Sequence, residues 1–436
     1  MGNLSLYIHI PFCVKKCNYC DFLSAPCNEE TKQKYVDVLC SEIAYRAKQF
    51  KDRKVDTVFF GGGTPSILSV EQSVKLMDTI RQKFHILPEA EISMELNPGT
   101  VNRKKLETYQ KMGINRLSIG LQSADNDELK ILGRIHTWEV FLQTWNMVRE
   151  VGFTNVNIDL MSALPGQTLE SYKSTLRKVL ALKPEHISAY SLIIEEGTKF
   201  YEWFGEEGEY AAAVKEEPGF LILSENNAAQ EVDKVQEQSM EMRSMKIKSK
   251  KLPDEITDRQ MYEMTRDLLE EHGYYRYEIS NYALPGYECK HNAGYWKRKE
   301  YLGLGLGAAS LLFGDHGENI RSSNISDVNQ YLKINLEKGI SKEEFNKGSK
   351  WIEEQTYLTK EEQMEEFMFL GLRMMEGISS IEFEKQFEKS LQEVYGEQIC
   401  KLEKQGLLEF CEETQRFRLT LRGIDVSNQV FVEFIE

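Results

Sequence analysis

PFCVKKCNYCDF, residues 11–22, places three cysteines in the spacing C-x3-C-x2-C, within a chain of 436 residues that contains eight cysteines. These three are Cys13, Cys17 and Cys20. A structural zinc site closes with four ligands, and the next cysteine, Cys27, is out of register for a fourth. Three thiolates can instead bind three irons of a [4Fe-4S] cluster and leave its fourth iron open. The loop therefore predicts such a cluster, with zinc as the second interpretation.

An open iron suits one particular chemistry. It can bind the amino and carboxylate groups of S-adenosylmethionine, so that an electron from the cluster cleaves the sulfonium and releases a carbon radical. Unligated buried thiols are the plainer reading, but three within eight residues, beside Lys15, Lys16 and Asn18, fit it poorly. The missing fourth thiolate is thus the functional feature of the loop.

The charge of the chain indicates which partners to expect. Lys and Arg total 54 against 69 Asp and Glu, a formal charge of −15, which argues against nucleic acid as the partner. The start, MGNLSLYIHIPF, lacks the basic region and apolar core of a secretory signal, and no apolar run approaches the roughly 20 residues of a spanning helix. Eight scattered cysteines suit a reducing compartment. We expect a cytoplasmic protein.

Six short apolar segments alternate with helical patterns in the first half of the chain. Such alternation predicts parallel strands joined by right-handed crossovers, and hence a partial (β/α)6 barrel over residues 1–205. Ser69 and Gln72 have the spacing of a capping box before one of the helices. The predicted strands are SLYIHI (5–10), VDTVFF (55–60), EISMEL (91–96), RLSIGL (116–121), NVNIDL (155–160) and HISAYSL (186–192).

Polar and small residues follow the ends of these strands. Because the carboxyl ends of parallel strands meet at one edge, these residues should converge on one mouth. They are the cysteine loop, the glycines of GGGTP (61–65), Glu95 and Asn97, Gln122, and Asp159.

The rest of the chain divides into three segments. Residues 206–253 are polar and densely charged, which predicts an insertion or linker that can be shortened without loss of cofactors. Residues 254–355 are expected to complete the barrel. Residues 356–436 read as helices followed by a strand pair, which suggests a small C-terminal winged-helix-like domain. With 9 Lys or Arg against 17 Asp or Glu, that domain is a poor candidate for reading DNA.

YIHIPFCVKKCNYCDF (7–22) together with GGGTPS (61–66) resembles the radical S-adenosylmethionine superfamily, in the branch of oxygen-independent coproporphyrinogen III oxidases and their haem chaperone relatives. The resemblance spans almost the whole chain apart from the insertion. It implies that Cys13, Cys17 and Cys20 bind the cluster. It also implies contacts to S-adenosylmethionine from Tyr7, Tyr19, Gly62, Gly63, Thr64, Glu95, Gln122, Arg134 and Asp159. Taken alone, each has an ordinary structural reading: a tight turn, a strand-end acid, or a salt-bridge arginine.

Two features indicate the branch. Coproporphyrinogen oxidases resemble this loop but carry a further cysteine two positions after the third ligand, and this chain has Phe22 there. The haem chaperones carry H-N-x-x-Y-W, which appears here as HNAGYW (291–296), preceded by Cys289. Imidazole and thiolate both ligate haem iron, so His291 and Cys289 are the candidate haem ligands. A histidine held by its neighbours for structural reasons is the alternative.

Three functional hypotheses follow from these patterns. The first is a haem chaperone that binds the cluster, S-adenosylmethionine and haem, takes an electron from a one-electron donor, and delivers haem to a membrane-associated respiratory acceptor, with peripheral association to that membrane. The second is an enzyme, either an oxygen-independent coproporphyrinogen III oxidase or a radical methyltransferase. The third is a zinc-stabilised interaction module. The resemblance favours the first, and whether the chain is itself an enzyme stays open.

Overall fold

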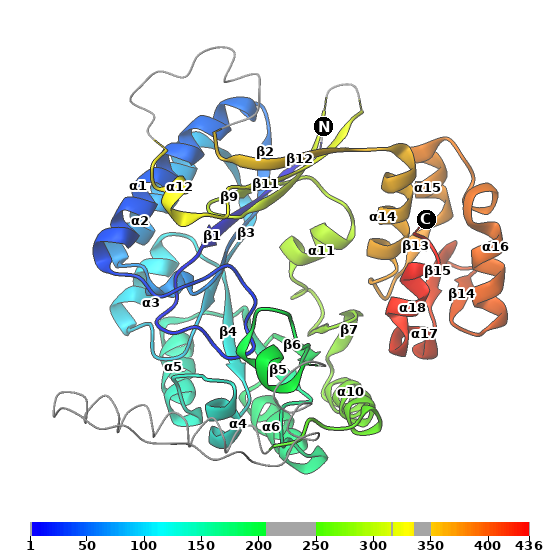
Figure 1. Cartoon of the computed structure of the whole chain (residues 1–436), viewed down its shortest axis with the longest axis horizontal. Helices are drawn as coiled ribbons and strands as arrows, with labels where there is room; N and C mark the ends of the chain where they lie inside the picture. The colour runs from blue at the N-terminus through cyan, green and yellow to red at the C-terminus, as the bar shows by residue number, and fades with distance from the viewer. Residues whose placement is uncertain (1, 206–249, 315–316, 335–349, 436) are drawn as a thin grey trace, which may run out of the picture.

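The computed structural model describes residues 2–205, 250–314, 317–334 and 350–435. Its larger part is a curved sheet with helices on the outer face, and its smaller part is a C-terminal domain (Figure 1). The predicted insertion 206–253 lies outside the described residues except for its last four positions. Among the residues that are described, no helix is both long and apolar enough to cross a membrane.

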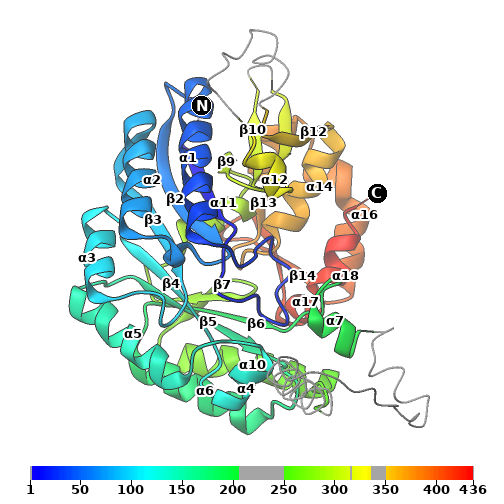
Figure 2. The ribbon, with the colours of Figure 1, turned by 60° about the vertical axis from the view of Figure 1, so that its left-hand side comes forward.

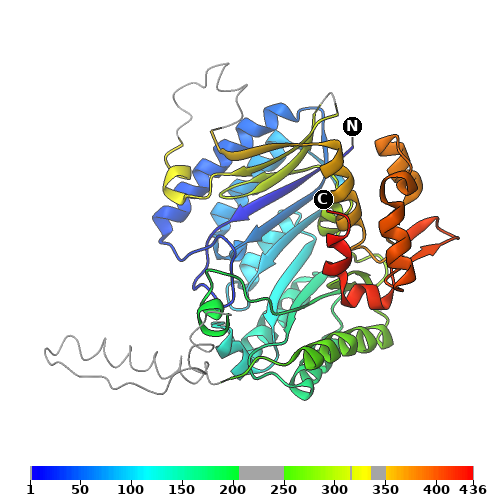
Figure 3. The ribbon, with the colours of Figure 1, turned by 45° about the vertical axis from the view of Figure 1, so that its right-hand side comes forward.

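All six predicted strands are present, and they pair in parallel in chain order. Their apolar residues are buried almost throughout, as expected for strands covered on both faces. Figure 3 shows them side by side in the curved sheet. The strands are β1 (Leu4–Ile10), β2 (Lys54–Gly62), β3 (His85–Leu96), β4 (Arg116–Gln122), β5 (Val156–Ser162) and β6 (His186–Ser191).

Helices cross from one strand to the next on the outside of the sheet (Figure 2). The capping box predicted at Ser69 and Gln72 is present at the start of the second helix, and Thr168 and Ser171 form another at the start of the sixth. The crossover helices are α1 (Glu29–Arg46), α2 (Val70–Lys83), α3 (Arg103–Lys111), α4 (Asn126–Ile131), α5 (Trp138–Val151) and α6 (Leu169–Leu182); α7 (Lys199–Phe204) follows β6, and two short 3-10 turns lie at Ala47–Gln49 and Pro65–Ile67.

The sheet is wider and more mixed than the six-strand pattern predicts. At one edge β8 (Asn281–Ala283) and β7 (Tyr275–Glu278) follow β6 in antiparallel pairing. At the other edge β9 (Tyr301–Leu304) pairs in parallel with β1 and is followed by the antiparallel strands β10 (Ala309–Phe313), β11 (Asn319–Asn324) and β12 (Ile352–Leu358). The helices of this region are α10 (Glu255–Glu271), α11 (Lys290–Trp296) and α12 (Val328–Tyr331).

The C-terminal domain has a hydrophobic core of its own, which includes Phe383, Ile399 and Val430. The strand pair predicted in residues 406–420 is confirmed as β14 and β15. A buried ion pair between Arg298 Nε and Glu366 Oε2, 3.0 Å apart, fastens this domain to the barrel. Its elements are α14 (Lys360–Gly371), β13 (Ile378–Ser379), α15 (Ser380–Phe387), α16 (Leu391–Lys404), β14 (Leu408–Cys411), β15 (Arg416–Leu419), α17 (Leu421–Asp425) and α18 (Ser427–Val432).

Candidate functional site

The three cysteines lie on the loop that connects β1 to α1, at the carboxyl end of the first strand. All three thiols are free and partly exposed. The loop closes on itself, because the Cys13 amide donates to the carbonyl of Ala25 at 3.2 Å and the Ala25 amide donates to that of Pro11 at 3.0 Å. This closure holds the three thiols on one short segment.

Asn18, in the middle of the loop, fastens it to the neighbouring crossover. Its backbone amide donates to the carbonyl of Leu132 at 2.9 Å, and its Nδ2 donates to the carbonyl of Ile131 at 2.9 Å. Gly133 packs against the same side chain, where an added Cβ would lie 2.9 Å from the Asn18 amide. The cysteine loop is therefore attached at its middle as well as at its ends.

A chain of hydrogen bonds links two of the thiols across three strand ends. Thr64 donates to Cys13 Sγ at 3.4 Å, and Asn97 Nδ2 donates to Thr64 Oγ1 at 2.8 Å. From the other side Arg134 donates through Nη2 to Asn97 Oδ1 at 2.8 Å and through Nη1 to Cys17 Sγ at 3.7 Å. We call Thr64, Asn97 and Arg134 the thiol belt. It places a fixed positive charge beside thiols that would ligate iron as thiolates.

The glycines after β2 are required by close packing against the first strand. Gly62 has φ +108°, and a Cβ there would lie 2.5 Å from Cε1 of His9. A Cβ on Gly63 would lie 2.7 Å from the carbonyl oxygen of Phe12. The Gly62 amide donates to Glu95 Oε2 at 3.2 Å, so the turn also orients a carboxylate at the mouth.

Tyr7 and His9 form a pair on the inner face of β1. His9 Nε2 donates to the carbonyl of Leu23 at 3.0 Å, which leaves Nδ1 to accept from the Tyr7 hydroxyl at 3.0 Å. Burial lowers the pKa of His9, which keeps the ring neutral. Burial, and next the charge of Glu95, raise the pKa of Tyr7. His9 thus links Tyr7, a predicted cofactor contact, to Leu23, which follows the last cysteine of the loop.

Glu95 and Asp159 form an acidic pair between β3 and β5. Burial raises the pKa of Glu95 to about 8, and the negative charge of Asp159 adds to that rise. Burial likewise raises the pKa of Asp159, although Asn157 donates to it at 2.7 Å and Ser118 at 3.1 Å. Two neighbouring carboxyl groups with raised pKa values form a site that would favour a cationic ligand.

Tyr190 lies near both Gln122 and Tyr19, because it bonds to Gln122 and packs against the same hydrophobic cluster as Tyr19. Gln122 ends β4 with φ +73°, and its Oε1 accepts from the Tyr190 hydroxyl at 3.1 Å. The ring of Tyr19 packs 6.4 Å from that of Phe200, and burial raises its pKa, partly offset by Arg134.

Of the residues predicted to contact S-adenosylmethionine, Gly62, Glu95 and Gln122 lie at strand ends, and Tyr19, Gly63, Thr64 and Arg134 lie on loops. Tyr7 lies in the middle of β1, and Asp159 lies in the middle of β5 rather than at its end, because β5 continues to Ser162.

Three cysteine thiols are the donor set that a [4Fe-4S] cluster with one open iron requires. In the described ranges no three His, Cys, Asp or Glu side chains are placed to share one metal ion. Each thiolate of a [4Fe-4S] cluster binds a different iron, so its ligands stand further apart than those of one zinc ion. Arg134 Nε is buried with no hydrogen-bond partner among the described residues, so the belt has a donor still to be satisfied.

The HNAGYW segment forms α11, which lies on the inner side of the sheet between β2 and the C-terminal domain (Figure 1). His291 is 1% exposed. Its Nδ1 lies 2.7 Å from Thr57 Oγ1, its Nε2 lies 2.8 Å from the Tyr295 hydroxyl, and its ring stacks on Phe59 with centroids 5.1 Å apart. Burial lowers the pKa of His291 to about 3. Iron ligation by either nitrogen would require one of these hydrogen bonds to break.

Cys289 lies at the N-terminus of the same helix and is fully buried. Burial raises the pKa of its thiol to about 12, and its Sγ lies 3.5 Å from Glu91 Oε1. Glu91 also accepts the backbone amides of Lys290, at 3.0 Å, and His291, at 3.1 Å. A carboxylate from β3 therefore caps α11 and fixes the helix in the barrel. The assignment of His291 and Cys289 as haem ligands stays a prediction.

The sequence does not predict a role for three residues of this site. Asn97 follows a predicted strand, but no local pattern indicates that it joins Thr64 to Arg134. His9 lies beside the cysteine loop, but its partner Leu23 is 14 residues away. No pattern indicates a role for Glu91, because its partners are about 200 residues further along the chain.

Comparison with known proteins shows which families the chain resembles. Residues 7–179 match the family described as "Radical SAM superfamily", and residues 358–426 match "HemN C-terminal domain". The structure of coproporphyrinogen III oxidase (HemN) from Escherichia coli superposes with a TM-score of 0.75 at 24% identity, covering 99% of this chain and 90% of that one. At that identity the likeness shows the fold alone.

Similar sequences narrow the family further. "Heme chaperone HemW" of Lactococcus lactis is 35% identical, over 99% of this chain and 97% of that protein. "Heme chaperone HemW" of Bacillus subtilis is 33% identical over 99% of each. The protein of the same name in Escherichia coli is 32% identical over 87% of this chain and 85% of its own length. The chain therefore belongs to the HemW family of haem chaperones within the radical SAM superfamily.

Proposed function

We propose that this chain binds a [4Fe-4S] cluster, S-adenosylmethionine and haem, and delivers the haem to a membrane-associated respiratory acceptor protein. The observation that carries the proposal is the 35% identity over 99% of the chain with a protein named as a haem chaperone. The acceptor would bring the chain to the membrane surface from the cytoplasm, and a one-electron donor would reduce the cluster.

Cys13, Cys17 and Cys20 would hold the cluster on the loop after β1. Support comes from three free, partly exposed thiols on one closed loop and from the guanidinium of Arg134 beside Cys17. The positive charge of Arg134 would stabilise the negative charge of an iron-bound Cys17. The Thr64 hydroxyl donates a hydrogen bond to Cys13 Sγ.

S-adenosylmethionine would occupy the mouth between the cysteine loop, the glycine turn and the acidic pair. When it is bound at the open iron of the cluster, it supplies a carbon radical. Gly62 and Gly63 leave room for close backbone approach, as the short Cβ distances there indicate. Glu95 and Asp159 would accept from an amino group or ribose hydroxyls, and Tyr7, Tyr19 and Gln122 surround them. The positive charge of the ligand would lower the raised pKa of Glu95.

Haem would contact α11 through His291, Cys289 or both. The aromatic rings of Tyr295 and Phe59 beside His291 could lie against a porphyrin face. Because both ring nitrogens of His291 already contact hydroxyl groups, ligation needs a local rearrangement that frees one of them. This cost limits the affinity expected from a single ligand.

One reconstituted sample tests the proposal. The chain is loaded anaerobically with iron and sulfide, and its iron and sulfide content, haem titration and turnover of coproporphyrinogen III are measured side by side. We expect about four irons, a haem complex with a distinct Soret band, and transfer of that haem to an acceptor in membrane vesicles. Decarboxylation of coproporphyrinogen III without haem transfer would make the chain an oxidase.

Matched cysteine variants make this test specific. Cys17→Ala should abolish the cluster absorption, whereas Cys400→Ala, at an exposed position of α16 in the C-terminal domain, should leave it unchanged. Retention of the cluster and of S-adenosylmethionine cleavage in Cys17→Ala would show that the ligand assignment is wrong.

A further inference from the structure

A row of hydrogen bonds runs along the inner face of the sheet from β5 through β6 to β7. Asn157 Nδ2 donates to Asp159 Oδ1 at 2.7 Å, and Asn157 Oδ1 lies 2.6 Å from His186 Nδ1. Across the imidazole, His186 Nε2 lies 2.9 Å from the Tyr277 hydroxyl, and that oxygen accepts the backbone amide of Cys289 at 3.3 Å. We call Asn157, His186 and Tyr277 the inner link. They join Asp159, a predicted S-adenosylmethionine contact, to the N-terminus of α11.

The donors of the inner link all point toward Asp159. Because Asn157 donates to Asp159 through its Nδ2, its Oδ1 is the acceptor that faces His186. Burial, and next the positive charge of Arg116, lower the pKa of His186, which keeps the ring neutral. A neutral ring with its proton on Nδ1 accepts at Nε2, so the Tyr277 hydroxyl donates to it. Hydrogen bonds that run in one direction strengthen one another, so a ligand at Asp159 affects all of them.

Only the ends of the inner link are placed to meet a ligand. Asp159 is partly exposed, whereas the three side chains of the link are buried, with exposed fractions of 2% for Asn157, 0% for His186 and 6% for Tyr277. The far end is the amide of Cys289, which precedes α11 and is one of the two candidate haem ligands. The inner link therefore connects the two proposed ligand sites through side chains that neither ligand would touch.

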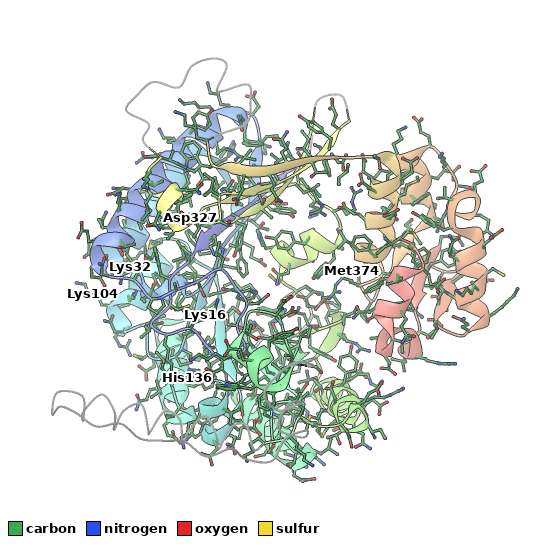
Figure 4. All side chains as sticks on the ribbon, viewed as in Figure 1. Lys16, Lys32, Lys104, His136, Asp327 and Met374 are labelled. Atoms are coloured by element: carbon green, nitrogen blue, oxygen red, sulfur yellow. The ribbon has the colours of Figure 1, made fainter. Side chains whose placement is uncertain are left out.

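Tyr277 is also held by the C-terminal domain. Its carbonyl accepts the amide of Met375 at 3.0 Å, and its ring packs in an apolar cluster with Ala283 and Met374. Figure 4 labels Met374 between α11 and the helices of that domain. The ring of His186 lies edge-on to that of Tyr277, with centroids 5.6 Å apart. Because the tyrosine ring is fixed on these sides, a change in the bonds of its hydroxyl acts on the amide that begins α11 rather than on the ring.

We propose that the inner link holds α11 in response to S-adenosylmethionine at Asp159, so that S-adenosylmethionine and haem each weaken the binding of the other. Its three members are thus positioning residues. The inference rests on the proposed function, from which it takes both ligands. S-adenosylmethionine is a cation, and a cation beside Asp159 favours the ionised carboxylate, which accepts more strongly from Asn157. The strengthened inner link then holds the N-terminus of α11 more firmly.

Haem binding needs the opposite change at α11. Both ring nitrogens of His291 already contact hydroxyl groups, and the Cys289 thiol lies 3.5 Å from Glu91, so ligation by either residue requires α11 to release a contact. A firmly held α11 therefore binds haem more weakly, and S-adenosylmethionine favours the release of haem. By linkage, haem lowers the affinity for S-adenosylmethionine by the same factor.

Haemin titration with and without saturating S-adenosylmethionine measures the coupling. The cluster of the reconstituted parent is kept oxidised, so that S-adenosylmethionine binds without being cleaved, and haemin binding is followed by the Soret band. We expect S-adenosylmethionine to raise the Kd for haemin about five-fold, at the low end of couplings between sites. Calorimetry with S-adenosylmethionine on the haem-loaded parent should show the same factor.

Two variants cut the inner link at different places. Tyr277→Phe removes the hydroxyl and keeps the ring, and His186→Asn keeps a donor near Asn157 but does not reach Tyr277. In both variants the Kd for haemin should no longer depend on S-adenosylmethionine. The matched control is Tyr172→Phe, which removes an equally buried hydroxyl that bonds to Thr265 at 2.9 Å between α6 and α10. This control should keep the coupling of the parent.

Hydrogen–deuterium exchange gives a readout that needs no haem. S-adenosylmethionine should slow exchange of the amides of residues 289–296 in the parent and in Tyr172→Phe, but not in Tyr277→Phe or His186→Asn. A merely structural role of the Tyr277 hydroxyl would change that exchange equally with and without S-adenosylmethionine.

The outcomes separate the coupling from the proposed function. A parent that binds no S-adenosylmethionine, or no haemin, would overturn the proposed function. A parent that binds both, with its haemin affinity unchanged or increased by S-adenosylmethionine, would overturn the coupling alone. So would Tyr277→Phe and His186→Asn proteins that show the same coupling factor as Tyr172→Phe.

Discussion

Arg134 donates from Nη1 to the Sγ of Cys17 at 3.7 Å, so a buried guanidinium lies directly against one of the three thiols of the loop. Through Nη2 the same side chain reaches Asn97, and Asn97 reaches Thr64 and hence Cys13. The spacing of the Cys13 and Cys17 thiols is therefore coupled to one arginine that lies more than a hundred residues further along the chain. If the proposed cofactor sites are right, Arg134 would act on the cluster through Cys17 as well as on S-adenosylmethionine.

Replacing Arg134 with Lys should weaken the binding of both the cluster and S-adenosylmethionine. A lysine keeps the charge but cannot donate in two fixed directions, so the link between Asn97 and Cys17 is lost. We expect about ten-fold weaker S-adenosylmethionine binding and partial loss of iron after desalting, measured by calorimetry and iron analysis. Arg418→Lys, at an exposed ion pair with Glu409, is the matched control and should change neither. If Arg134→Lys keeps the S-adenosylmethionine affinity and iron content of the parent, the thiol belt contributes only to packing.

Glu95 should make the stability of the cofactor-free protein depend on pH. Its pKa is raised to about 8 in the folded chain, so the folded state keeps a proton that the unfolded state loses near pH 4.5. The free energy of unfolding should therefore fall as pH rises from about 5 to 8, by at most about 1.4 kcal/mol per pH unit from this group. Above pH 8 both states are ionised and the slope from Glu95 disappears.

Glu95→Gln removes that proton and should remove its share of the slope. The measurement is urea unfolding of the parent and the variant at pH 5.5, 6.5 and 7.5, followed by tryptophan fluorescence. The parent should lose stability relative to Glu95→Gln with each step, and saturating S-adenosylmethionine should reduce the parent's slope. Parallel curves for the two proteins would mean that Glu95 ionises normally in the folded chain.

The parts of the fold that local pattern specifies were predictable. β1 to β6 are apolar runs with helices between them, and parallel pairing then brings the strand ends to one edge. The cysteine loop, the glycine turn and Glu95 could therefore be placed at one mouth from the sequence. β7 to β12 were not, because most of them pair antiparallel at the two edges of the sheet, outside the strand–helix–strand pattern.

Contacts between distant residues account for what the sequence left open. The thiol belt depends on how three side chains from three different segments meet, which no spacing encodes. The HNAGYW segment shows two aromatic residues and one histidine, but the pattern does not say whether that histidine is exposed or buried. Only packing against Thr57 and Phe59 on β2, and capping by Glu91 on β3, place His291 inside the barrel.

His291→Ala should weaken haem binding and leave the cluster intact, since the two sites use different residues. We expect a moderate loss with a shifted Soret band, because Cys289 or water can replace one ligand and the porphyrin still buries apolar surface. The variant also breaks the contacts to Thr57 and Tyr295, so its melting temperature should drop. Cys289→Ser in parallel indicates which residue is the axial ligand.

Thr57→Val separates ligation from packing. It removes the 2.7 Å contact to His291 Nδ1 at nearly constant volume and leaves every candidate iron ligand in place. If His291 ligates iron, Thr57→Val should lower the melting temperature while its haem spectrum keeps the parent's shape. If Thr57→Val and His291→Ala change the haem titration equally, the histidine acts by holding α11. Parent-like titrations of the His291 and Cys289 variants and of their double variant would exclude both as ligands.

Gly62→Ala should disrupt the mouth through one contact. The residue has φ +108°, which costs an alanine about 1 kcal/mol, and the new Cβ would lie 2.5 Å from Cε1 of His9. The imidazole would have to move, which breaks its bonds to Tyr7 and Leu23 and loosens the cysteine loop. We expect a lower melting temperature and at least ten-fold weaker S-adenosylmethionine binding.

Gly286 supplies the control for this change. It also has a left-handed backbone, with φ +87°, but an added Cβ there would meet nothing within 4 Å. Gly286→Ala should therefore show the backbone cost alone, with cofactor binding unchanged. Combining Gly62→Ala with His9→Ala makes room for the methyl group, so it should recover part of the stability lost in Gly62→Ala while leaving S-adenosylmethionine binding weak. Equal effects of Gly62→Ala and Gly286→Ala on binding would show that His9 does not connect the glycine turn to the cysteine loop.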